Sequence, residues 1–309
     1  MHALTYLDAE ELRERLPMAT AIEAMRLAYG DDREVPQRLA LGVSLFMPGR
    51  AGSHTGIKVV STVPGNPVGL VAVFGPDGSP LGVVDGTTLT AIRTGAGAGL
   101  ATALLARPDA RTLAMLGAGA MASDQVDAVC SVRPIDRVLV WSRTRARAEA
   151  LADRLASSAA AGRLGAAAGG QPPGAGAATR IRAEVADSPD AAVAEADVVT
   201  TATPATSPLF AASAARPTVH VNAVGAYTPA MAELPPGLLH ASWVVVEDRA
   251  AAAQEAGDLL QAGRSPDAEM GDLLAGRVTP PPDTPTVFKS VGIASMDVAA
   301  AVAALSPPT

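Results

Sequence analysis

The stretch Leu113-Ala114-Met115-Leu116-Gly117-Ala118-Gly119-Ala120-Met121-Ala122 decides the fold. Its apolar first half predicts a buried strand, and the glycine turn after it predicts that a helix follows. Gly117 would make the tight turn, Gly119 would let the backbone approach a ligand, and Ala122 would allow close packing of helix on strand. This arrangement places the pyrophosphate of a dinucleotide at a helix N-terminus. We therefore expect Gly117, Gly119, Ala120 and Met121 to bind a dinucleotide.

The end of the next strand indicates which dinucleotide. The run Arg137-Val138-Leu139-Val140-Trp141-Ser142 follows at the distance expected of a βαβ unit. Proteins that bind NAD usually carry Asp or Glu here, where the carboxylate accepts hydrogen bonds from the ribose 2′-hydroxyl. Ser142, Arg143 and Thr144 stand there instead and can bind a 2′-phosphate, so we expect NADPH, with NADH as the alternative. In the other interpretation Arg143 and Arg145 are solvated residues opening the next helix, a position unfavourable for the helix dipole.

Composition limits the class of protein. The chain has 309 residues, which exceeds the usual size of a single core and predicts two domains or one with a large appendage. Its net charge of −7 argues against binding to nucleic acid or to an anionic membrane. Cys130 is the single cysteine, which excludes an intrachain disulfide and suits a reducing compartment. No apolar run reaches the roughly 18 residues of a membrane helix, and acidic residues interrupt the N-terminus, so we expect a cytoplasmic protein.

The order of elements predicts an α/β fold: a Rossmann-type parallel-sheet domain plus an α+β domain. Helices are expected within residues 8–29 and 89–106, and strands at 41–47, 56–63, 69–74 and 81–84, the last two as a hairpin across Pro76-Asp77-Gly78. From residue 111 strands and helices alternate, as a parallel sheet requires. The low-complexity run at 157–179 is expected to be a mobile insertion. We expect residues 112–285 to form the Rossmann domain, and residues 1–111 with 286–309 to form the other.

Basic residues in the first region suggest an acidic ligand. Lys58 and Arg93 each lie in apolar sequence, where a charge is costly unless it is paired or faces a ligand. Arg38 is a third cation in the same region. One interpretation is that Lys58 and Arg93 pair with Asp77 or Asp85. Taken together in an acidic chain, the three cations favour a substrate that carries a carboxylate.

Motifs along the whole chain, apart from 157–179, resemble the ornithine cyclodeaminase/mu-crystallin family. They are Gly56-Ile57-Lys58-Val59-Val60, Asp85-Gly86-Thr87, Leu89-Thr90-Ala91-Ile92-Arg93-Thr94, 116–122, 138–144, Val221-Asn222-Ala223-Val224-Gly225, Glu255-Ala256-Gly257-Asp258 and 288–292. The resemblance implies that a substrate-binding and dimerisation domain, made from the N-terminal region and the C-terminal tail, accompanies the Rossmann domain in a homodimer. It also implies that Arg38 and Arg93 bind the substrate carboxylate, and that Lys58 contacts the substrate and assists proton transfer.

Departures from the family pattern indicate the branch. Cyclodeaminases carry Asp in a Gly-x-Asp-x-Pro-Gly-Lys motif, where this chain has Tyr227, a candidate for substrate contact. The acid after the second Rossmann strand is also absent, and the segment between Asn66-Pro67 and Val71 looks shorter than in relatives. These features favour the reductase branch, which reduces Δ1-pyrroline-2-carboxylate or Δ1-piperideine-2-carboxylate with NAD(P)H. The alternatives are an ornithine cyclodeaminase, which makes proline and ammonia while recycling NAD, and a protein that retains NADPH without turnover.

Further polar residues fall at strand ends. Thr203 and Asn222 are expected to meet the cofactor ribose or the nicotinamide amide, and Ser290 and Gly292 to close over the ring, although such residues also cap strands. The histidines show no metal-ligand spacing, so no metal is expected. His220 alternates within a strand and is interpreted as a hydrogen-bonded core residue.

Overall fold

The chain divides into two compact units, Met1–Gly97 with Gly292–Thr309, and Ala98–Val291. The computed structural model describes residues 4–63, 68–160, 164–165 and 181–306. The expected division lay after residues 111 and 285. At the C-terminal boundary, β14 (Thr286–Lys289) pairs with two strands of the second unit, and the residues from Gly292 onward belong to the first. Of the expected insertion, residues 157–160 end a helix, and most of the rest lies outside the described residues, as do Asn66 and Pro67.

The first unit contains, in its described part, a six-stranded sheet of order β1-β6-β5-β4-β3-β2. Its strands are β1 (Tyr6–Leu7), β2 (Leu39–Leu41), β3 (Ser44–Ala51), β4 (His54–Ser61), β5 (Gly69–Phe74) and β6 (Pro80–Asp85). Its helices are α1 (Ala9–Arg15), α2 (Met18–Ala28), α11 (Ala294–Leu305) and the first part of α3 (Gly86–Leu105). The antiparallel pairing of β5 with β6 confirms the expected hairpin.

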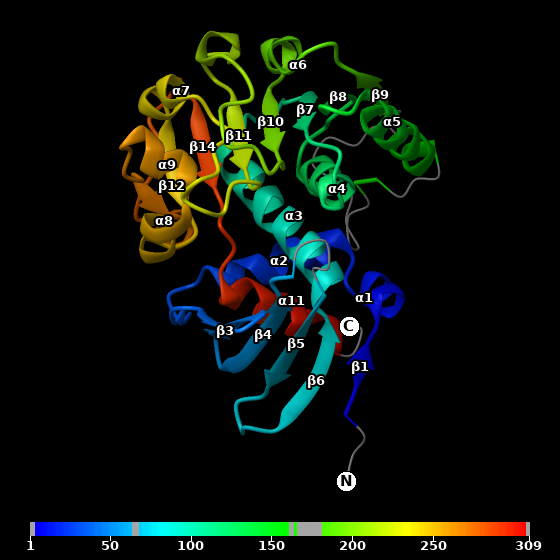
Figure 1. Cartoon of the computed structure of the whole chain (residues 1–309), viewed down its shortest axis with the longest axis vertical. Helices are drawn as coiled ribbons and strands as arrows, with labels where there is room; N and C mark the ends of the chain where they lie inside the picture. Colours follow the sequence, from blue (N-terminus) through cyan, green and yellow to red (C-terminus); the bar gives the residue numbers. More distant parts are fainter. Residues whose placement is uncertain (1–3, 64–67, 161–163, 166–180, 307–309) are drawn as a thin grey trace. The chain divides into compact units, whose positions relative to one another are not determined.

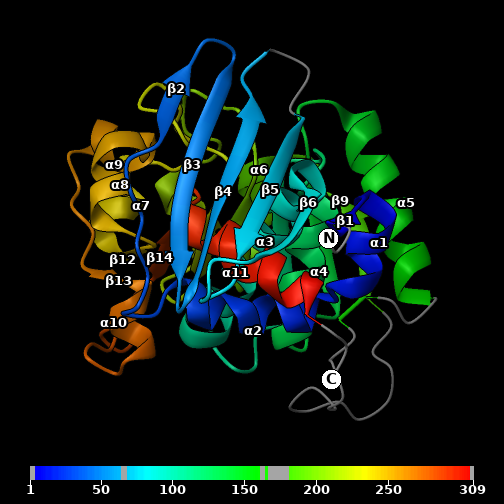
Figure 2. The same cartoon turned by 90° about the horizontal axis from the view of Figure 1, so that it is seen from below.

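The two faces of this sheet differ. Helix α11 packs on β3 to β6, with α2 beside it (Figure 2). Side chains alternate between faces along a strand, and directly paired residues share a face. The row Met47, Lys58, Val71 and Val84 is buried and lies on the face that α11 covers. The opposite face carries the row that runs from Leu39 to Leu70, in which these two leucines are exposed.

The second unit is a doubly wound α/β domain, as expected. Its described part contains an eight-stranded, wholly parallel sheet of order β13-β12-β14-β11-β10-β7-β8-β9 (Figure 1). Besides β14 the strands are β7 (Thr112–Leu116), β8 (Arg137–Trp141), β9 (Arg182–Val185), β10 (Val198–Thr201), β11 (His220–Ala223), β12 (Trp243–Val246) and β13 (Ala268–Glu269). The helices are α4 (Ala122–Val132), α5 (Arg145–Ala160), α6 (Pro189–Glu195), α7 (Pro236–Ala241), α8 (Arg249–Glu255), α9 (Gly257–Ala262), α10 (Met270–Leu274) and a 3₁₀ turn at Ala212–Ala214.

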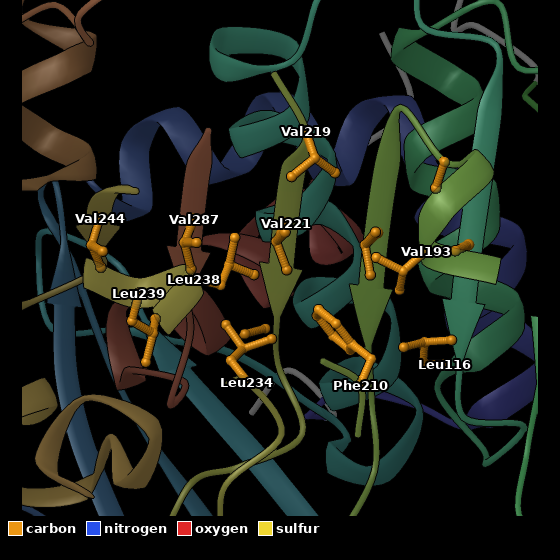
Figure 3. Close-up of a cluster of buried hydrophobic side chains, with 14 of the residues drawn as sticks. Leu116, Val193, Phe210, Val219, Val221, Leu234, Leu238, Leu239, Val244 and Val287 are labelled. Carbon is orange, nitrogen blue, oxygen red and sulfur yellow. The ribbon is translucent and has the colours of Figure 1, made fainter. Parts of the chain in front are cut away.

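Alternation along the strands of this sheet supplies two cores. Leu116 and Val199 point into a cluster formed with Val193 of α6, Leu238 of α7 and other residues (Figure 3). Their neighbours Met115 and Val198 belong to the opposite cluster, which includes residues of α4 and α5. Because both faces are covered by helices, the strands read as nearly continuous apolar runs. No helix in the described ranges combines the length and apolar character needed to cross a membrane.

Candidate active site

The glycine turn after β7 has the geometry that its sequence predicts. Gly117 has a φ of 120°, and a Cβ there would come within 2.5 Å of the Ala202 carbonyl oxygen, so only glycine fits. A Cβ on Gly119 would meet nothing within 4 Å, which means that its backbone borders open space. Helix α4 begins at Ala122, which is buried against the strand. A strand, a tight turn and a helix N-terminus therefore meet at one open edge.

A cavity of about 410 Å³ lies at this edge. The predicted residues that line it are Gly117, Gly119, Ser142, Arg143, Thr144 and Thr203. Arg147, in the first turn of α5, also lines it and was not anticipated. Ala120 and Met121 lie in the turn that leads into α4 and are not among the lining residues. The cavity thus combines a backbone suited to a pyrophosphate with two guanidinium groups.

The arginines near this cavity differ in their partners. Arg145 pairs with Glu149 at 3.0 Å and with Asp187 at 3.6 Å. Among the described residues, no carboxylate pairs with Arg143, which is exposed on the cavity wall. An exposed guanidinium without a carboxylate partner is available to bind an anionic group.

Glu233 is a buried acid that the sequence analysis missed. Its carboxylate accepts hydrogen bonds from the amide and hydroxyl of Thr203, at 2.7 and 2.8 Å, and from the amides of Gly225 and Ala226, at 2.8 and 3.1 Å. Burial raises the pKa of Glu233, while the positive charge of Lys289 opposes that rise. The carboxylate therefore joins the loops that follow β10 and β11, and fixes the cavity residue Thr203.

A buried ion pair next to Glu233 is a second feature that the sequence analysis missed. Lys289, at the end of β14, forms an ion pair of 2.9 Å with Asp258, and neither side chain is exposed. Asp258 also accepts hydrogen bonds from the amides of Glu233 and Leu234, at 2.6 and 2.9 Å. Lys289 donates to the carbonyl oxygens of Ala223 and Ala226. The pair thus ties the end of β14 and the start of α9 to the loop that follows β11.

Other predicted residues are placed elsewhere. The Asn222 amide donates to Thr102 at 2.9 Å and lies 3.1 Å from a His220 ring nitrogen, within the core. The Ser290 hydroxyl donates to Glu247 at 2.6 Å. Tyr227 is 55% exposed. The structure therefore does not bring Asn222 or Ser290 to the cavity wall beside Thr203.

The first unit holds a buried cluster of charges on the covered face of its sheet. Lys58 of β4 lies 3.3 Å from Asp297 of α11, and Arg93 of α3 lies 3.1 Å from the same Oδ1 atom. All three side chains are nearly or fully buried. The Lys58 ammonium also donates to the Thr90 hydroxyl at 2.5 Å. Asp297, which the sequence analysis did not single out, is thus the partner of both cations.

The structure does not pair Lys58 or Arg93 with Asp77 or Asp85. Asp77 bonds to the amide and hydroxyl of Ser79 in its turn, and Asp85 accepts from the amide of Thr88. These contacts are local, within three residues in the chain, so each carboxylate serves a turn or a helix start.

Arg38 and Arg93 meet at Gly292. Arg38 donates to the Gly292 carbonyl oxygen at 2.7 Å. Gly292 has a φ of 76°, and a Cβ there would lie 2.6 Å from an Arg93 guanidinium nitrogen. The expected contact of Gly292 with the cofactor ring stays a prediction; within this unit its lack of a Cβ makes room for Arg93, and its carbonyl oxygen binds Arg38.

The pKa of Lys58 reflects its burial and the charges around it. The pKa of Lys58 is lowered to about 8, chiefly by burial; Asp297 opposes this shift, and the positive charges of Arg93 and Arg38 add to it. The cluster therefore holds more positive than negative charge, and its amine can gain or lose a proton near neutral pH.

Cys130 and His220 carry reactive side chains that lie in the core. Burial raises the pKa of the Cys130 thiol, which lies on the buried side of α4, and lowers the pKa of His220 to about 3. His220 bonds to Thr286 and Asn222, which confirms its interpretation as a core residue. Among the described residues, no group of His, Cys, Asp or Glu could hold a metal ion.

Comparisons with known proteins agree on one family. The family model described as the ornithine cyclodeaminase/mu-crystallin family matches residues 34–166 and 175–304. The Δ1-pyrroline-2-carboxylate reductase of Bacillus cereus is 34% identical, over 94% of this chain and 93% of that protein. The L-lysine cyclodeaminase of Streptomyces rapamycinicus is 32% identical, over 95% and 86%. The solved Δ1-pyrroline-2-carboxylate reductase of Thermococcus litoralis, in complex with NADH and L-proline, has a TM-score of 0.85 and 27% identity over 98% and 96% of the chains.

Proposed function

Because the chain belongs to the ornithine cyclodeaminase/mu-crystallin family, we propose that it reduces a cyclic imine carboxylate to the cyclic amino acid with NAD(P)H. The substrate is Δ1-pyrroline-2-carboxylate or Δ1-piperideine-2-carboxylate. The observation that carries the proposal is the buried cluster of Lys58 and Arg93, which share the single carboxylate of Asp297. A buried excess of positive charge favours an anionic ligand, such as a substrate carboxylate.

The reaction requires a hydride at C2 of the imine and a proton on its nitrogen. A bound nicotinamide supplies the hydride. Arg38 and Arg93, held together by Gly292, bind the substrate carboxylate and orient C2. Lys58, whose pKa is about 8, holds the proton for the nitrogen. Tyr227, at the position of the cyclodeaminase Asp, contacts the substrate in this proposal.

The cofactor is proposed to bind in the cavity after β7. Gly117, Gly119, Ala120 and Met121 form the pyrophosphate turn, and Thr203 supports the ribose, with its position fixed by Glu233. Asn222, Ser290 and Gly292 stay predicted contacts of the nicotinamide. Ser142, Arg143 and Thr144, with Arg147, favour NADPH over NADH by binding a 2′-phosphate. NADH stays the alternative, since the Thermococcus litoralis relative binds it.

Incubation with the imines tests this function. When the protein is mixed with NADPH and either imine, the nicotinamide absorbance should fall. Proline or the six-membered cyclic amino acid should form, as measured by chromatography. Ornithine with catalytic NAD should release little ammonia, since the acid expected at position 227 of a cyclodeaminase is absent. Ammonia release without imine reduction would favour a cyclodeaminase, and retained NADPH without either reaction would favour a binding protein.

Arg143 should decide between the two cofactors. We expect Arg143→Ala to raise the KM for NADPH by about 10- to 100-fold, the usual range for losing charged hydrogen bonds. The KM for NADH should change little, because NADH lacks the 2′-phosphate. Steady-state kinetics with both cofactors provide the measurement.

Arg145→Ala is the matched control for this cofactor test, since Arg145 already pairs with Glu149. It should leave both constants within about two- to threefold. An equal rise for NADH and NADPH in Arg143→Ala would argue that Arg143 does not bind the phosphate.

The open face of the six-stranded sheet supports a homodimer as the proposed assembly. Leu39, Leu41, Leu70 and Phe74 are large apolar residues exposed on its strands. Contiguous apolar patches on a sheet face mark interaction sites, and a second copy offers the same self-complementary surface.

Leu70→Lys tests the dimer. Leu70 is 47% exposed and pairs with Asp85, which can accommodate an ammonium in the monomer. Burying this charge between copies should raise the dimer dissociation constant by about 100-fold. Light scattering should then report a monomer at micromolar protein. Leu260→Lys, at an exposed leucine of α9, is the control and should leave the assembly unchanged.

A further inference from the structure

Asp297 is the centre of the buried charge cluster. Its Oδ1 accepts from the Lys58 ammonium at 3.3 Å and from the Arg93 Nε at 3.1 Å. Its Oδ2 is buried, and within the described part of the chain it accepts no hydrogen bond. This second oxygen is therefore available to accept a further hydrogen bond.

The charges that face Lys58 come from α3, from the segment before β2 and from α11, whereas the flanking strands β3 and β5 place the apolar Met47 and Val71 beside it. Arg93 and Thr90 lie on α3, Arg38 precedes β2, and Asp297 lies on α11. Three of these groups, Arg38, Arg93 and Asp297, carry charge, and only the last is negative. Burial and the arginines disfavour the ammonium, so Asp297 is the group that retains it.

We propose that Asp297 is a positioning residue for the proposed reductase, on whose function this inference rests. Its carboxylate aligns Lys58 with Arg93 and keeps Lys58 in the form that delivers a proton to the imine nitrogen. Asp297 acts through Lys58, without contact to the reacting carbon. The proton moves from the ammonium to nitrogen as the hydride reaches C2, and the amine of Lys58 is reprotonated from solvent.

The sequence permits a direct test of Lys58. Its only lysines are Lys58 and Lys289. Competitive labelling with acetic anhydride across pH, read by mass spectrometry, therefore reports the titration of Lys58 with no turnover. Lys289, which is fully buried, reports any unfolding.

Asp297→Asn keeps the shape and removes the charge. We expect the labelling midpoint of Lys58 to fall by about 1 pH unit or more from the wild-type value near 8. The basic limb of the kcat/KM profile should move down by the same amount. Thr90→Val removes an acceptor of Lys58 but no charge, and should shift both by less. Equal shifts in the two variants, or none in Asp297→Asn, would overturn the proposal.

Asp297→Glu keeps the charge and so tests position, even if the asparagine variant fails to fold. The labelling midpoint should stay near the wild-type value, while kcat falls about 10-fold or more because the carboxylate is displaced. An unchanged kcat would overturn the positioning role. A labelling shift in Asp297→Asn, with no imine turnover by any variant, would retain the coupling to Lys58 and reject the reductase function.

Discussion

Replacing Lys58 by methionine should lower kcat/KM for imine reduction by about 10²- to 10⁴-fold, the range typical of a lost proton-transfer group. The same change should leave the protein as stable as before, or more so. Lys58 lies on the covered face between Met47 and Val71, where a methionine of similar length fits. Burial lowers the pKa of its amine, which means that folding carries a cost for burying the ammonium. Stopped-flow kinetics and thermal melting provide the two measurements.

The stability result separates a catalytic from a structural role for Lys58. Asp297 keeps its contact with Arg93 when Lys58 is removed, so no carboxylate is left without a cation. The dissociation constant for NADPH should stay within a fewfold of wild type. If instead melting temperature and activity fell together, Lys58 would be a structural residue and the mechanism would be wrong. Lys58→Arg, which keeps a charge that cannot be lost near neutral pH, should not restore turnover.

Local patterns were sufficient to predict the strand, the glycine turn and the helix of the proposed dinucleotide site. The turn at Gly117 follows from steric rules, because a positive φ beside a neighbouring strand allows only glycine. Ser142, Arg143 and Thr144 directly follow β8. They therefore lie at the carboxyl edge of the parallel sheet, which is where open α/β sheets bind ligands. Arg147 lies in the first turn of α5, which begins two residues after Arg143, so its approach to the same cavity depends on how that helix begins.

The charge cluster was predicted only in part. Burial of Lys58 and Arg93 was expected from their apolar neighbours, but their partner was sought among Asp77 and Asp85. The true partner, Asp297, is 239 residues from Lys58 in the chain, and such pairing depends on tertiary packing. A signal did exist, since Asp297 is the only charged residue in the alanine-rich helix α11.

The buried network of Glu233, Asp258 and Lys289 in the second unit was also missed. Lys289 follows Phe288 in an apolar strand, which predicts a buried charge with a partner, yet it was not considered. Glu233 lies in a loop and Asp258 in the first turn of the short helix α9, positions where acids are usually solvated. The burial of Glu233 follows from a close approach of the chain: a Cβ on Gly225 would lie 2.5 Å from a Glu233 carboxylate oxygen. No local pattern in the sequence indicates that approach.

Asp258→Asn should reduce the free energy of unfolding by about 3–5 kcal/mol, as expected when one partner of a buried ion pair is removed. The asparagine oxygen can still accept from the amides of Glu233 and Leu234, so the loss is that of the charge. Lys289, which is fully buried, would then lack its counter-charge. Urea unfolding followed by circular dichroism gives the measurement. Cofactor affinity should fall as well, because the loop that holds Thr203 through Glu233 depends on this pair.

The double variant Asp258→Asn with Lys289→Met decides whether the loss is electrostatic. Methionine fills similar space and carries no charge. Of the two backbone carbonyl oxygens that Lys289 had bonded, that of Ala223 still accepts from the Ser290 amide, so only that of Ala226 loses its partner. Replacing both members of a buried pair costs far less than replacing one. We therefore expect the double variant to recover more than half of the stability lost in Asp258→Asn. If the two substitutions instead added, the pair would contribute through packing and hydrogen bonds alone, since independent sites show no coupling energy.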